Sequence, residues 1–385
     1  MKDKKLTSKP MKSGLHLFTL AGFDVRLDFS WLILAFLVTW TLAVGYFPAN
    51  YPDFSAGTYW IMGVFGVIGL FLSIVFHELC HSLVGRRYGI PMEGITLFIF
   101  GGIANMTDMP PNPKSEFLMA VVGPIFSLAL GIGFYCLAQL GYYLQWQDQV
   151  TGVIQYLFII NIILGIFNLL PAFPLDGGRL LRATLWWWKQ DLKWATDIAC
   201  KGGAVLGFTL IMLGVLQFLW GAIISGIWLF ILGFFLQYIS KTSYQNVLIR
   251  QVFTDEPVKA YAKTDVVTVD QNVTIDTLMS DYFLQHYHKL YPVVKQNKLV
   301  GCISLKDVKA LDKEQWSSTK VSDVMRPCSE TTVIDADTKV MKALLTMNAN
   351  NISRMIVTKN NKLYGILTLK DLMNVVSVKL ALEES

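Results

Sequence analysis

Long apolar runs constrain this chain more than any other feature. A helix needs about 20 mainly apolar residues to cross a bilayer, because the hydrocarbon core is about 30 Å thick. Six segments reach or approach that length: residues 30–48, 58–83, 117–140, 152–170, 203–220 and 222–239. The last two are separated only by Trp220 and Gly221, so they form either a tight hairpin or one imperfectly divided pair. Residues 1–245 are therefore predicted to form a polytopic α-helical membrane domain.

The rest of the chain has a different character. The whole sequence is 53% hydrophobic and 16% charged, which is less charge than a soluble protein of 385 residues carries. Residues 246–385 lack the long apolar runs and are predicted to form a separate soluble domain. The net charge of +5 is too small and too scattered to indicate nucleic-acid binding. The five cysteines follow no regular spacing, so they predict neither a disulfide framework nor a Cys-x-x-Cys metal site.

Basic residues orient the predicted spans, because loops on the cytoplasmic side carry more lysine and arginine. The first twelve residues are rich in lysine, whereas the segments 49–57 and 141–151 contain neither basic residue. Basic residues also follow the second, fourth and sixth spans: Arg86, Arg87, Arg179, Arg182, Lys189, Lys193, Lys201, Lys241 and Arg250. We therefore expect a multi-pass protein of the plasma membrane, with its N-terminus and its C-terminal domain in the cytoplasm.

A candidate zinc motif, His77-Glu78-Leu79-Cys80-His81, lies near the end of the second span. Helical spacing places both imidazoles on one face, where they can share one zinc ion. Glu78 points about 100° away around the helix, near enough to take a proton from a water and later pass it to the leaving amine. Zinc would favour this step by lowering the pKa of that water.

The position of Glu78 distinguishes function from a structural role. Two interfacial histidines and a glutamate that reaches the membrane surface would produce the same pattern. However, Glu78 lies in a run with no other charge between Asp53 and Arg86, and an intramembrane carboxylate is costly, which favours function. Glu78 precedes Arg86 by eight residues, about 12 Å of helix, so the zinc is predicted below the cytoplasmic membrane surface.

Catalytic zinc needs a third protein ligand and leaves its fourth position for water. Asp176 is favoured, because it follows the fourth span in Asn168-Leu169-Leu170-Pro171-Ala172-Phe173-Pro174-Leu175-Asp176-Gly177-Gly178-Arg179. The prolines end the helix, and the glycines permit a turn that returns the carboxylate toward the histidines. An ordinary turn explains the spacing equally well. The other candidate ligands are His16, Glu93, Asp108 and Glu116.

The two motifs together resemble the site-2 protease family of intramembrane zinc metalloproteases, in the prokaryotic branch with tandem CBS domains at the C-terminus. The resemblance covers nearly the whole chain. It implies that His77, His81 and Asp176 bind one Zn²⁺ per chain and that Glu78 is the catalytic carboxylate. The expected reaction is hydrolysis of a peptide bond in a transmembrane helix of a membrane-protein substrate, near the cytoplasmic face.

Three further features of the membrane domain have two interpretations each. Residues 95–106 match a short β-region of that family. An unwound substrate could pair with this region as an added strand. Alternatively, these residues simply turn the chain at Gly101-Gly102. Asn168 could donate a hydrogen bond to the oxyanion, or it could join helices, as could Asn161 on the same face. Gly123-Pro124 in the third span is predicted to be a helix-packing kink rather than a gate.

The C-terminal domain contains an internal repeat. Residues 293–307 recur as 357–371 at an offset of 64 residues, and each copy has the order strand, helix, strand, turn, strand, helix. The repeat resembles a CBS pair, with CBS1 at about 253–312 and CBS2 at about 318–380. By that resemblance Ser304, Asp307, Thr368 and Asp371 would bind ATP or another adenine nucleotide. The alternative is that these four residues are helix caps.

The CBS resemblance also implies a homodimer through these domains, in addition to the lipid bilayer and the substrate as partners. Two rival functions follow from the same sequence. A CBS-regulated membrane transporter or channel should show several intramembrane charges or a repeated transmembrane half, whereas this chain shows one cluster around Glu78. A catalytically silent scaffold has no need of Glu78, because that residue is not required for zinc binding.

Overall fold

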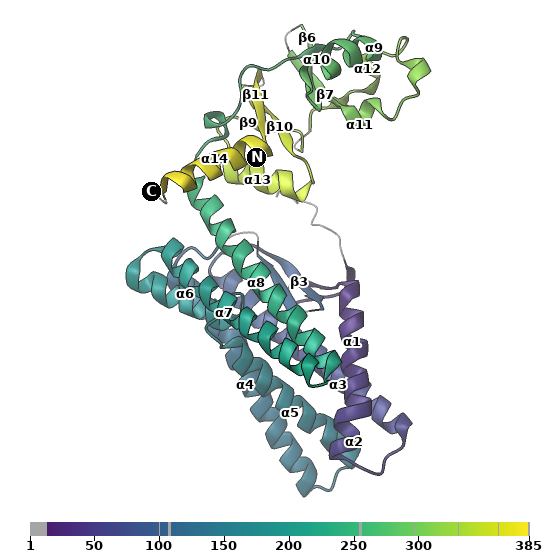
Figure 1. Ribbon diagram of the computed structural model, residues 1–385, viewed down its shortest axis with the longest axis vertical. Coiled ribbons are helices and arrows are strands. Elements are labelled where there is room, and N and C mark those ends of the chain that lie inside the picture. The colour runs from purple at the N-terminus through teal and green to yellow at the C-terminus, as the bar shows by residue number, and fades with distance from the viewer. Residues whose placement is uncertain are drawn as a thin grey trace. The chain divides into compact units, whose positions relative to one another are not determined.

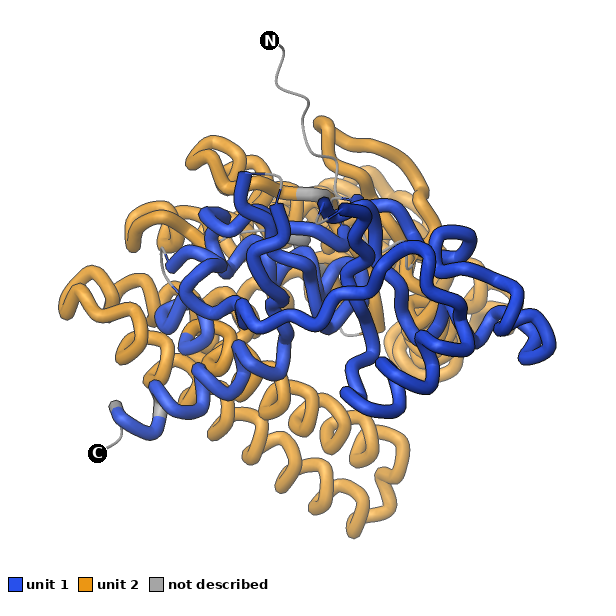
Figure 2. The backbone as a smooth tube through the Cα atoms, turned by 90° about the horizontal axis from the view of Figure 1, so that it is seen from above, with its two compact units in different colours: residues 1–9, 248–385 blue, residues 10–247 orange. Residues whose placement is uncertain are grey.

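The structure is a computed structural model that describes residues 14–99, 101–106, 109–253, 256–296, 298–329, 331–360 and 362–383 (Figure 1). The described residues divide into two compact units (Figure 2). The orange unit, residues 10–247, contains the long helices and is called the first unit below, and the blue unit, which includes residues 248–385, is called the second unit. The last long helix crosses the boundary in the chain and ends at Val252. The boundary in the chain follows the change in composition from apolar runs to an ordinary mixture of residues.

The first unit contains six helical segments that are long and apolar enough to cross a membrane. They are Phe29–Asn50, α3 (Ala56–Arg87), α4 (Pro113–Tyr143), α5 (Asp148–Asn168), α7 (Leu192–Leu219) and α8 (Ile223–Val252). The first comprises α1 (Phe29–Thr41), a π-helical turn (Leu42–Tyr46) and α2 (Phe47–Asn50). The predicted polytopic α-helical fold is thus confirmed, with the spans assigned by length and composition. The hairpin interpretation of the last two segments is also confirmed, because Gly221 turns the chain between α7 and α8 at φ +84°.

Helix α3 occupies the centre of this unit and contacts α1, α4 and α5. Its start is capped by Ser55, whose hydroxyl accepts a hydrogen bond from the Thr58 amide. Small residues bring the neighbouring helices close, as is usual in membranes: Gly66 packs against Tyr156 of α5, and Gly69 packs against Leu157. This packing fixes the turns of α3 that carry the zinc motif.

A four-stranded sheet lies beside α3. Its order is β1 (Leu15–Leu20), β2 (Phe23–Leu27), β3 (Met92–Phe98) and β4 (Gly101–Met106). Strands β2 and β3 are parallel, and the other two pairs are antiparallel. Val25, Ile95 and Leu97 are fully buried in a core that includes Leu79 of α3. The β-region expected at residues 95–106 therefore belongs to the β3–β4 hairpin, and β4 is an edge strand among the described residues.

The second unit repeats one strand–helix arrangement twice. Its strands are β5 (Val269–Asp270), β6 (Leu290–Lys295), β7 (Lys298–Ser304), β8 (Arg326–Pro327), β9 (Val333–Asp335), β10 (Arg354–Lys359) and β11 (Lys362–Thr368). Its α-helices are α9 (Ile275–Thr277), α10 (Leu284–His286), α11 (Leu305–Val308), α12 (Val321–Val324), α13 (Val340–Ala349) and α14 (Leu369–Glu383). The hairpins β6–β7 and β10–β11 share a bulge, at Val293/Val294 and at Val357/Thr358, which are 64 residues apart. The internal repeat in the sequence is therefore a structural repeat.

Candidate active site

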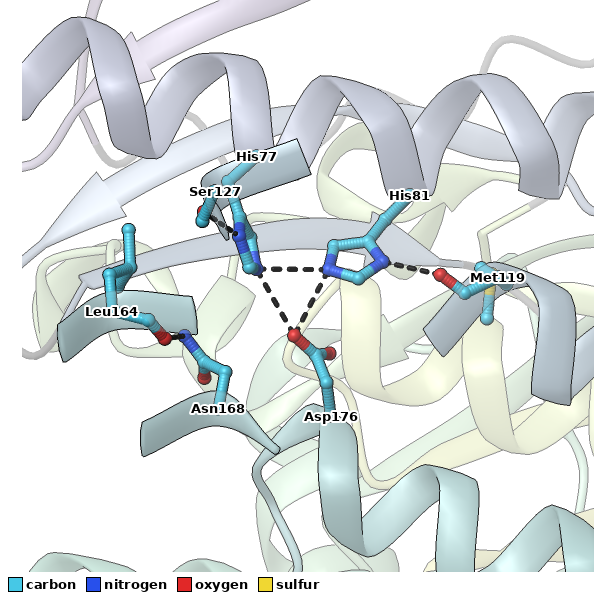
Figure 3. A network of polar contacts seen from close by, with 7 residues as sticks. All are labelled: His77, His81, Met119, Ser127, Leu164, Asn168 and Asp176. Carbon is cyan, nitrogen blue, oxygen red and sulfur yellow. Dashed lines mark hydrogen bonds and ion pairs between the residues drawn. The ribbon is translucent and has the colours of Figure 1, made fainter. Parts of the chain in front are cut away.

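Three buried side chains converge where α3, α4 and α6 (Asp176–Lys189) meet (Figure 3). The Nε2 atoms of His77 and His81 lie 3.1 Å apart. Asp176 Oδ2 lies 3.1 Å from the His77 nitrogen and 3.2 Å from the His81 nitrogen. The three residues are 3%, 3% and 8% exposed, so the cluster is closed to bulk water. Among the described residues, this is the one group of His, Cys, Asp and Glu with the spacing of a metal site.

The cluster has the chemistry of a cation site. His81 Nδ1 lies 2.5 Å from the Met119 carbonyl oxygen, which can only accept, so Nδ1 carries a proton and Nε2 is the ring atom that faces Asp176. A zinc ion in place of a proton on Nε2 would be bound by the Nε2 lone pair and by the Asp176 carboxylate. Tetrahedral zinc, with ligand bonds of about 2.0–2.1 Å, places its ligand atoms about 3.3–3.4 Å apart, close to the measured separations. The residues present therefore fit a zinc ion with one open position.

Asp176 is placed by its local chain geometry. The loop after α5 returns Asp176 to the first turn of α6, where Gly177 and Gly178 contact the backbone of residues 169–173 with no room for a side chain. Burial alone would raise the pKa of Asp176, but the two imidazoles outweigh it and hold that pKa below its ordinary value. The carboxylate is therefore ionised and available as a ligand. The ordinary-turn interpretation of Asp-Gly-Gly does not account for this convergence.

The other candidate ligands lie elsewhere. His16 is on β1, with Nε2 3.3 Å from the Thr19 hydroxyl and 3.5 Å from Asp24. Glu116 is fully buried in an ion pair with Arg182, whose Nε donates to Glu116 Oε1 at 2.8 Å. Asp108 and the side chain of Glu93 lie outside the described part of the chain. Of the candidates whose side chains are described, Asp176 alone joins the histidines.

Helix α4 supports both imidazoles, a role that the sequence did not reveal. His77 Nδ1 lies 2.8 Å from the Ser127 hydroxyl, while His81 bonds to the Met119 carbonyl, about two turns earlier on the same face of α4. Between them, a Cβ on Gly123 would lie 2.7 Å from His77 Nε2 and would also collide with the His81 ring. Gly123 thus has a packing role between α4 and α3, because its missing side chain makes room for the two rings, while the predicted kink stays a prediction. The spacing of four residues between Met119, Gly123 and Ser127 was the available signal.

Glu78 contacts the sheet and is not one of the three clustered ligand residues. It is half-buried, and a Cβ on Gly102 of β4 would lie 2.6 Å from Glu78 Cγ and 3.1 Å from Oε1. The glutamate side chain thus rests on the backbone of the edge strand. Any chain that pairs with β4 would pass beside this carboxylate.

The ion pair between Glu116 and Arg182 ties α6 to α4 next to the cluster. The Arg182 guanidinium also lies over the Phe173 ring, 5.1 Å from its centroid. Breaking a buried pair by removing one partner costs about 3–5 kcal/mol, because a buried charge is left without a partner. Arg182, which entered the sequence analysis only as a topology signal, therefore holds the helix that begins with Asp176.

The two asparagines of α5 have different surroundings. Asn161 is fully buried, and its amide donates to the Ser73 hydroxyl of α3 at 3.0 Å, which is the helix-joining role. Asn168 donates to the Leu164 carbonyl at 3.0 Å and lies near Asp176 (Figure 3). Its role toward an oxyanion stays a prediction.

In the second unit, the four predicted nucleotide residues form two matching turns. The Ser304 hydroxyl donates to Asp307 at 2.6 Å, and the Thr368 hydroxyl donates to Asp371 at 2.6 Å. These contacts are the helix caps of the alternative interpretation. Each aspartate also pairs with a basic residue that the sequence analysis missed: Arg326 Nε lies 2.5 Å from Asp307, and Lys263 Nζ lies 2.7 Å from Asp371.

Comparison with known proteins identifies relatives of this chain. The family model described as peptidase family M50 matches residues 65–145 and 139–214, and the CBS domain model matches 258–314 and 321–378. The chain is 31% identical to the putative zinc metalloprotease Rip3 of Mycobacterium tuberculosis, over 96% of this chain and 94% of the relative. It is 29% identical to a zinc metalloprotease of Methanocaldococcus jannaschii, over 96% and 97%. Among solved structures, the site-2 protease from that archaeon is 28% identical, with a TM-score of 0.43, over 60% of this chain and 94% of that chain.

Proposed function

This chain belongs to peptidase family M50, the site-2 proteases, with a C-terminal pair of CBS domains, and we propose that it cuts peptide bonds within transmembrane segments of membrane-protein substrates. The observation that carries the proposal is the buried cluster of His77, His81 and Asp176, because both histidines lie on α3, a helix long and apolar enough to cross a membrane. A hydrolase site at that depth serves a substrate that is itself in the membrane.

The proposed roles follow from the contacts of each residue. His77, His81 and Asp176 would hold the zinc, which when bound polarises the substrate carbonyl and lowers the pKa of a water. Glu78, half-buried beside them, accepts the proton of that water and returns it to the leaving nitrogen. The Asn168 amide donates to the oxyanion as the carbonyl carbon becomes tetrahedral. Met119 and Ser127 keep both rings in the orientation that directs Nε2 inward.

The zinc content of the purified chain tests this assignment. The native protein in detergent should hold about one zinc per chain, and His77→Ala and Asp176→Ala should lose it, because each leaves only two protein ligands. Elemental analysis measures the metal, and cleavage of a membrane-embedded test substrate measures the activity. A native protein without zinc, under conditions that spare weak sites, would contradict the proposal. Retention of zinc by Asp176→Ala alone would move the third ligand elsewhere.

Substrate entry is proposed to use the β4 edge. A helix cannot be cut while its carbonyls are hydrogen-bonded, and an unwound segment paired with β4 would pass beside Glu78. The N–H groups along a strand point alternately toward and away from its partner, so prolines at Ile103 and Ala104 remove one of each kind. The proline that removes the outward N–H should abolish cleavage while zinc is retained. Unchanged cleavage rates in both variants would exclude strand addition.

The CBS pair is proposed to bind an adenine nucleotide and so to modulate the protease. Asp307 and Asp371 would take the ribose hydroxyls, which frees Arg326 and Lys263 to face the phosphates. Asp307→Asn and Asp371→Asn should weaken ATP binding at least about tenfold in calorimetric titration of the full-length chain, since each loses a charge-assisted hydrogen bond. Asp337→Asn is the matched control, because Asp337 pairs with Lys259 at an exposed site outside the repeat turn. Equal affinity in all three variants would leave these turns as helix caps.

The remaining assignments concern topology and assembly. We propose that the membrane domain comprises residues 1–245 and that the CBS pair comprises 246–385 in the cytoplasm, with CBS1 at about 253–312 and CBS2 at about 318–380. The distribution of lysine and arginine supports the cytoplasmic side and a plasma-membrane location. A homodimer through the CBS domains rests on the resemblance alone.

A further inference from the structure

Helix α6 has two faces of opposite character. One face buries Asp176, Gly177, Gly178, Arg182 and Ala183. The other face exposes Trp187 and Trp188, which are 58% and 78% exposed, together with Thr184 and Lys189. With 14 residues the helix is too short to cross a bilayer. Two large indoles on one exposed face indicate a partner that is apolar but tolerates their N–H groups.

The exposed face of α6 continues into a hollow against α4. Thr184, Trp187, Trp188 and Phe117 of α4 line a space of about 270 Å³, and three of these four side chains are aromatic. Phe117 is itself 37% exposed. The hollow has the size and apolar lining for part of an acyl chain.

The contacts of α6 place it at one end of a membrane span. Arg182 binds Glu116, and Trp187 and Trp188 share the hollow with Phe117, so α6 lies against the first turns of α4. Helix α4 has 31 residues and is about 46 Å long, whereas the hydrocarbon core is about 30 Å thick. A centred α4 therefore extends about five residues past the hydrocarbon at each end. Phe117 is the fifth residue of α4, so the hollow lies at the boundary between hydrocarbon and headgroups.

Cationic and aromatic groups combine at the end of α6. Lys189 Nζ lies 4.2 Å from the Trp194 ring centroid, and Trp188 meets Trp194 edge to face with centroids 6.3 Å apart. Tryptophan concentrates at membrane–water boundaries, because its ring is apolar and its N–H needs a polar partner. A lysine beside it faces the anionic headgroups. Neither hydrocarbon nor water alone suits this combination.

We propose that Trp187, Trp188 and Lys189 of α6, with Phe117 of α4, form a lipid-binding surface at the membrane–water boundary. A phospholipid occupies it, with an acyl chain in the hollow and its headgroup at Lys189. Asp176 begins the same helix, and His81 bonds to α4 at Met119, two residues from Phe117. The bound lipid thereby sets the depth of the metal cluster below the membrane surface. This inference rests on the membrane assignment and not on the proposed protease activity.

Quenching of tryptophan fluorescence tests this surface without an activity assay. The full chain is placed in bilayers of phospholipids brominated either near the headgroup end or near the terminal end of the acyl chain. The native protein is compared with a Trp187→Phe/Trp188→Phe variant. The difference between their fluorescence signals is the contribution of these two indoles. Trp316→Phe is the control, because Trp316 packs in a core of the second unit.

The difference signal should be quenched at least about twofold more by bromine near the headgroups than by bromine near the chain ends, since indole prefers the boundary. The Trp316 difference should respond to neither lipid. Stronger quenching by terminal bromine would overturn the boundary placement. Quenching by aqueous iodide alone would show a water-facing surface, and no quenching by either agent would show that protein covers it.

Discussion

Replacing Gly123 by alanine is expected to lower the zinc affinity of the purified chain by more than about 100-fold, beyond the usual effect of losing an outer hydrogen-bond partner. The added Cβ would stand 2.7 Å from His77 Nε2 and closer still to the His81 ring. Real Cβ atoms do not approach a ring nitrogen so closely, so at least one imidazole must leave its position. Competition titration with a chromogenic zinc chelator measures the affinity.

Gly133→Ala is the matched control for this experiment. Gly133 lies on the same helix, and a Cβ there would meet no atom within 4 Å. Ser127→Ala provides an intermediate case, with an expected loss of about 10–100-fold because the His77 ring loses its hydroxyl partner. Gly123→Ala with native zinc affinity would show that the imidazoles do not need this space. Circular dichroism of each variant separates a local collision from misfolding.

Replacing Glu78 by glutamine is expected to lower the cleavage rate by about 10²–10⁴-fold, the usual contribution of a positioned proton acceptor. Glutamine has nearly the same shape as glutamate, so it keeps the contact with Gly102. Its amide, however, cannot accept the proton of the attacking water. The Nε2 and Oδ2 atoms of the three ligands are untouched, so the zinc content should stay native. Cleavage of a membrane-embedded test substrate and elemental analysis measure the two quantities on one preparation.

Cys80→Ala is the control for Glu78→Gln. Cys80 lies in the same motif and is half-buried, but it has no role in the proposed mechanism. It should leave both the zinc content and the cleavage rate near native. A cleavage rate for Glu78→Gln within about tenfold of native would fall below the range of general acid–base catalysis and would remove Glu78 from that role. Loss of zinc in Glu78→Gln would instead make Glu78 part of the metal site.

Family membership decides between the functions that the sequence left open. The chain belongs to a family of zinc metalloproteases, so the metalloprotease interpretation is confirmed over the transporter and the channel. The silent scaffold is tested by the Glu78→Gln variant. The sequence supported this outcome because His77-Glu78-Leu79-Cys80-His81 combines two ligand types with a carboxylate that zinc binding does not need. The substrate and the effect of nucleotide remain proposals, since both depend on molecules that bind from outside the chain.

Local patterns in the sequence determined the elements of this protein. Apolar runs predicted the six membrane helices, because burial in hydrocarbon acts on every residue of a span. The 64-residue repeat predicted the paired hairpins β6–β7 and β10–β11, because equal segments fold alike. Helical spacing placed His77 and His81 on one face, because four residues complete about one turn. Each of these predictions depends on patterns within short segments of the chain.

Only the tertiary structure decided what surrounds those elements. Strands β1 and β2 extend the sheet that begins after α3, and Gly123 of α4 faces two rings of another helix. Arg182 pairs with Glu116 across 66 residues, and Asp371 pairs with Lys263 across the repeat. Contacts between distant segments depend on how whole helices and strands pack. The hydrophobic periodicity of a single segment does not determine that packing. The sequence therefore determines which residues are candidates for the chemistry, and the packing of α3, α4 and α6 determines how they are held.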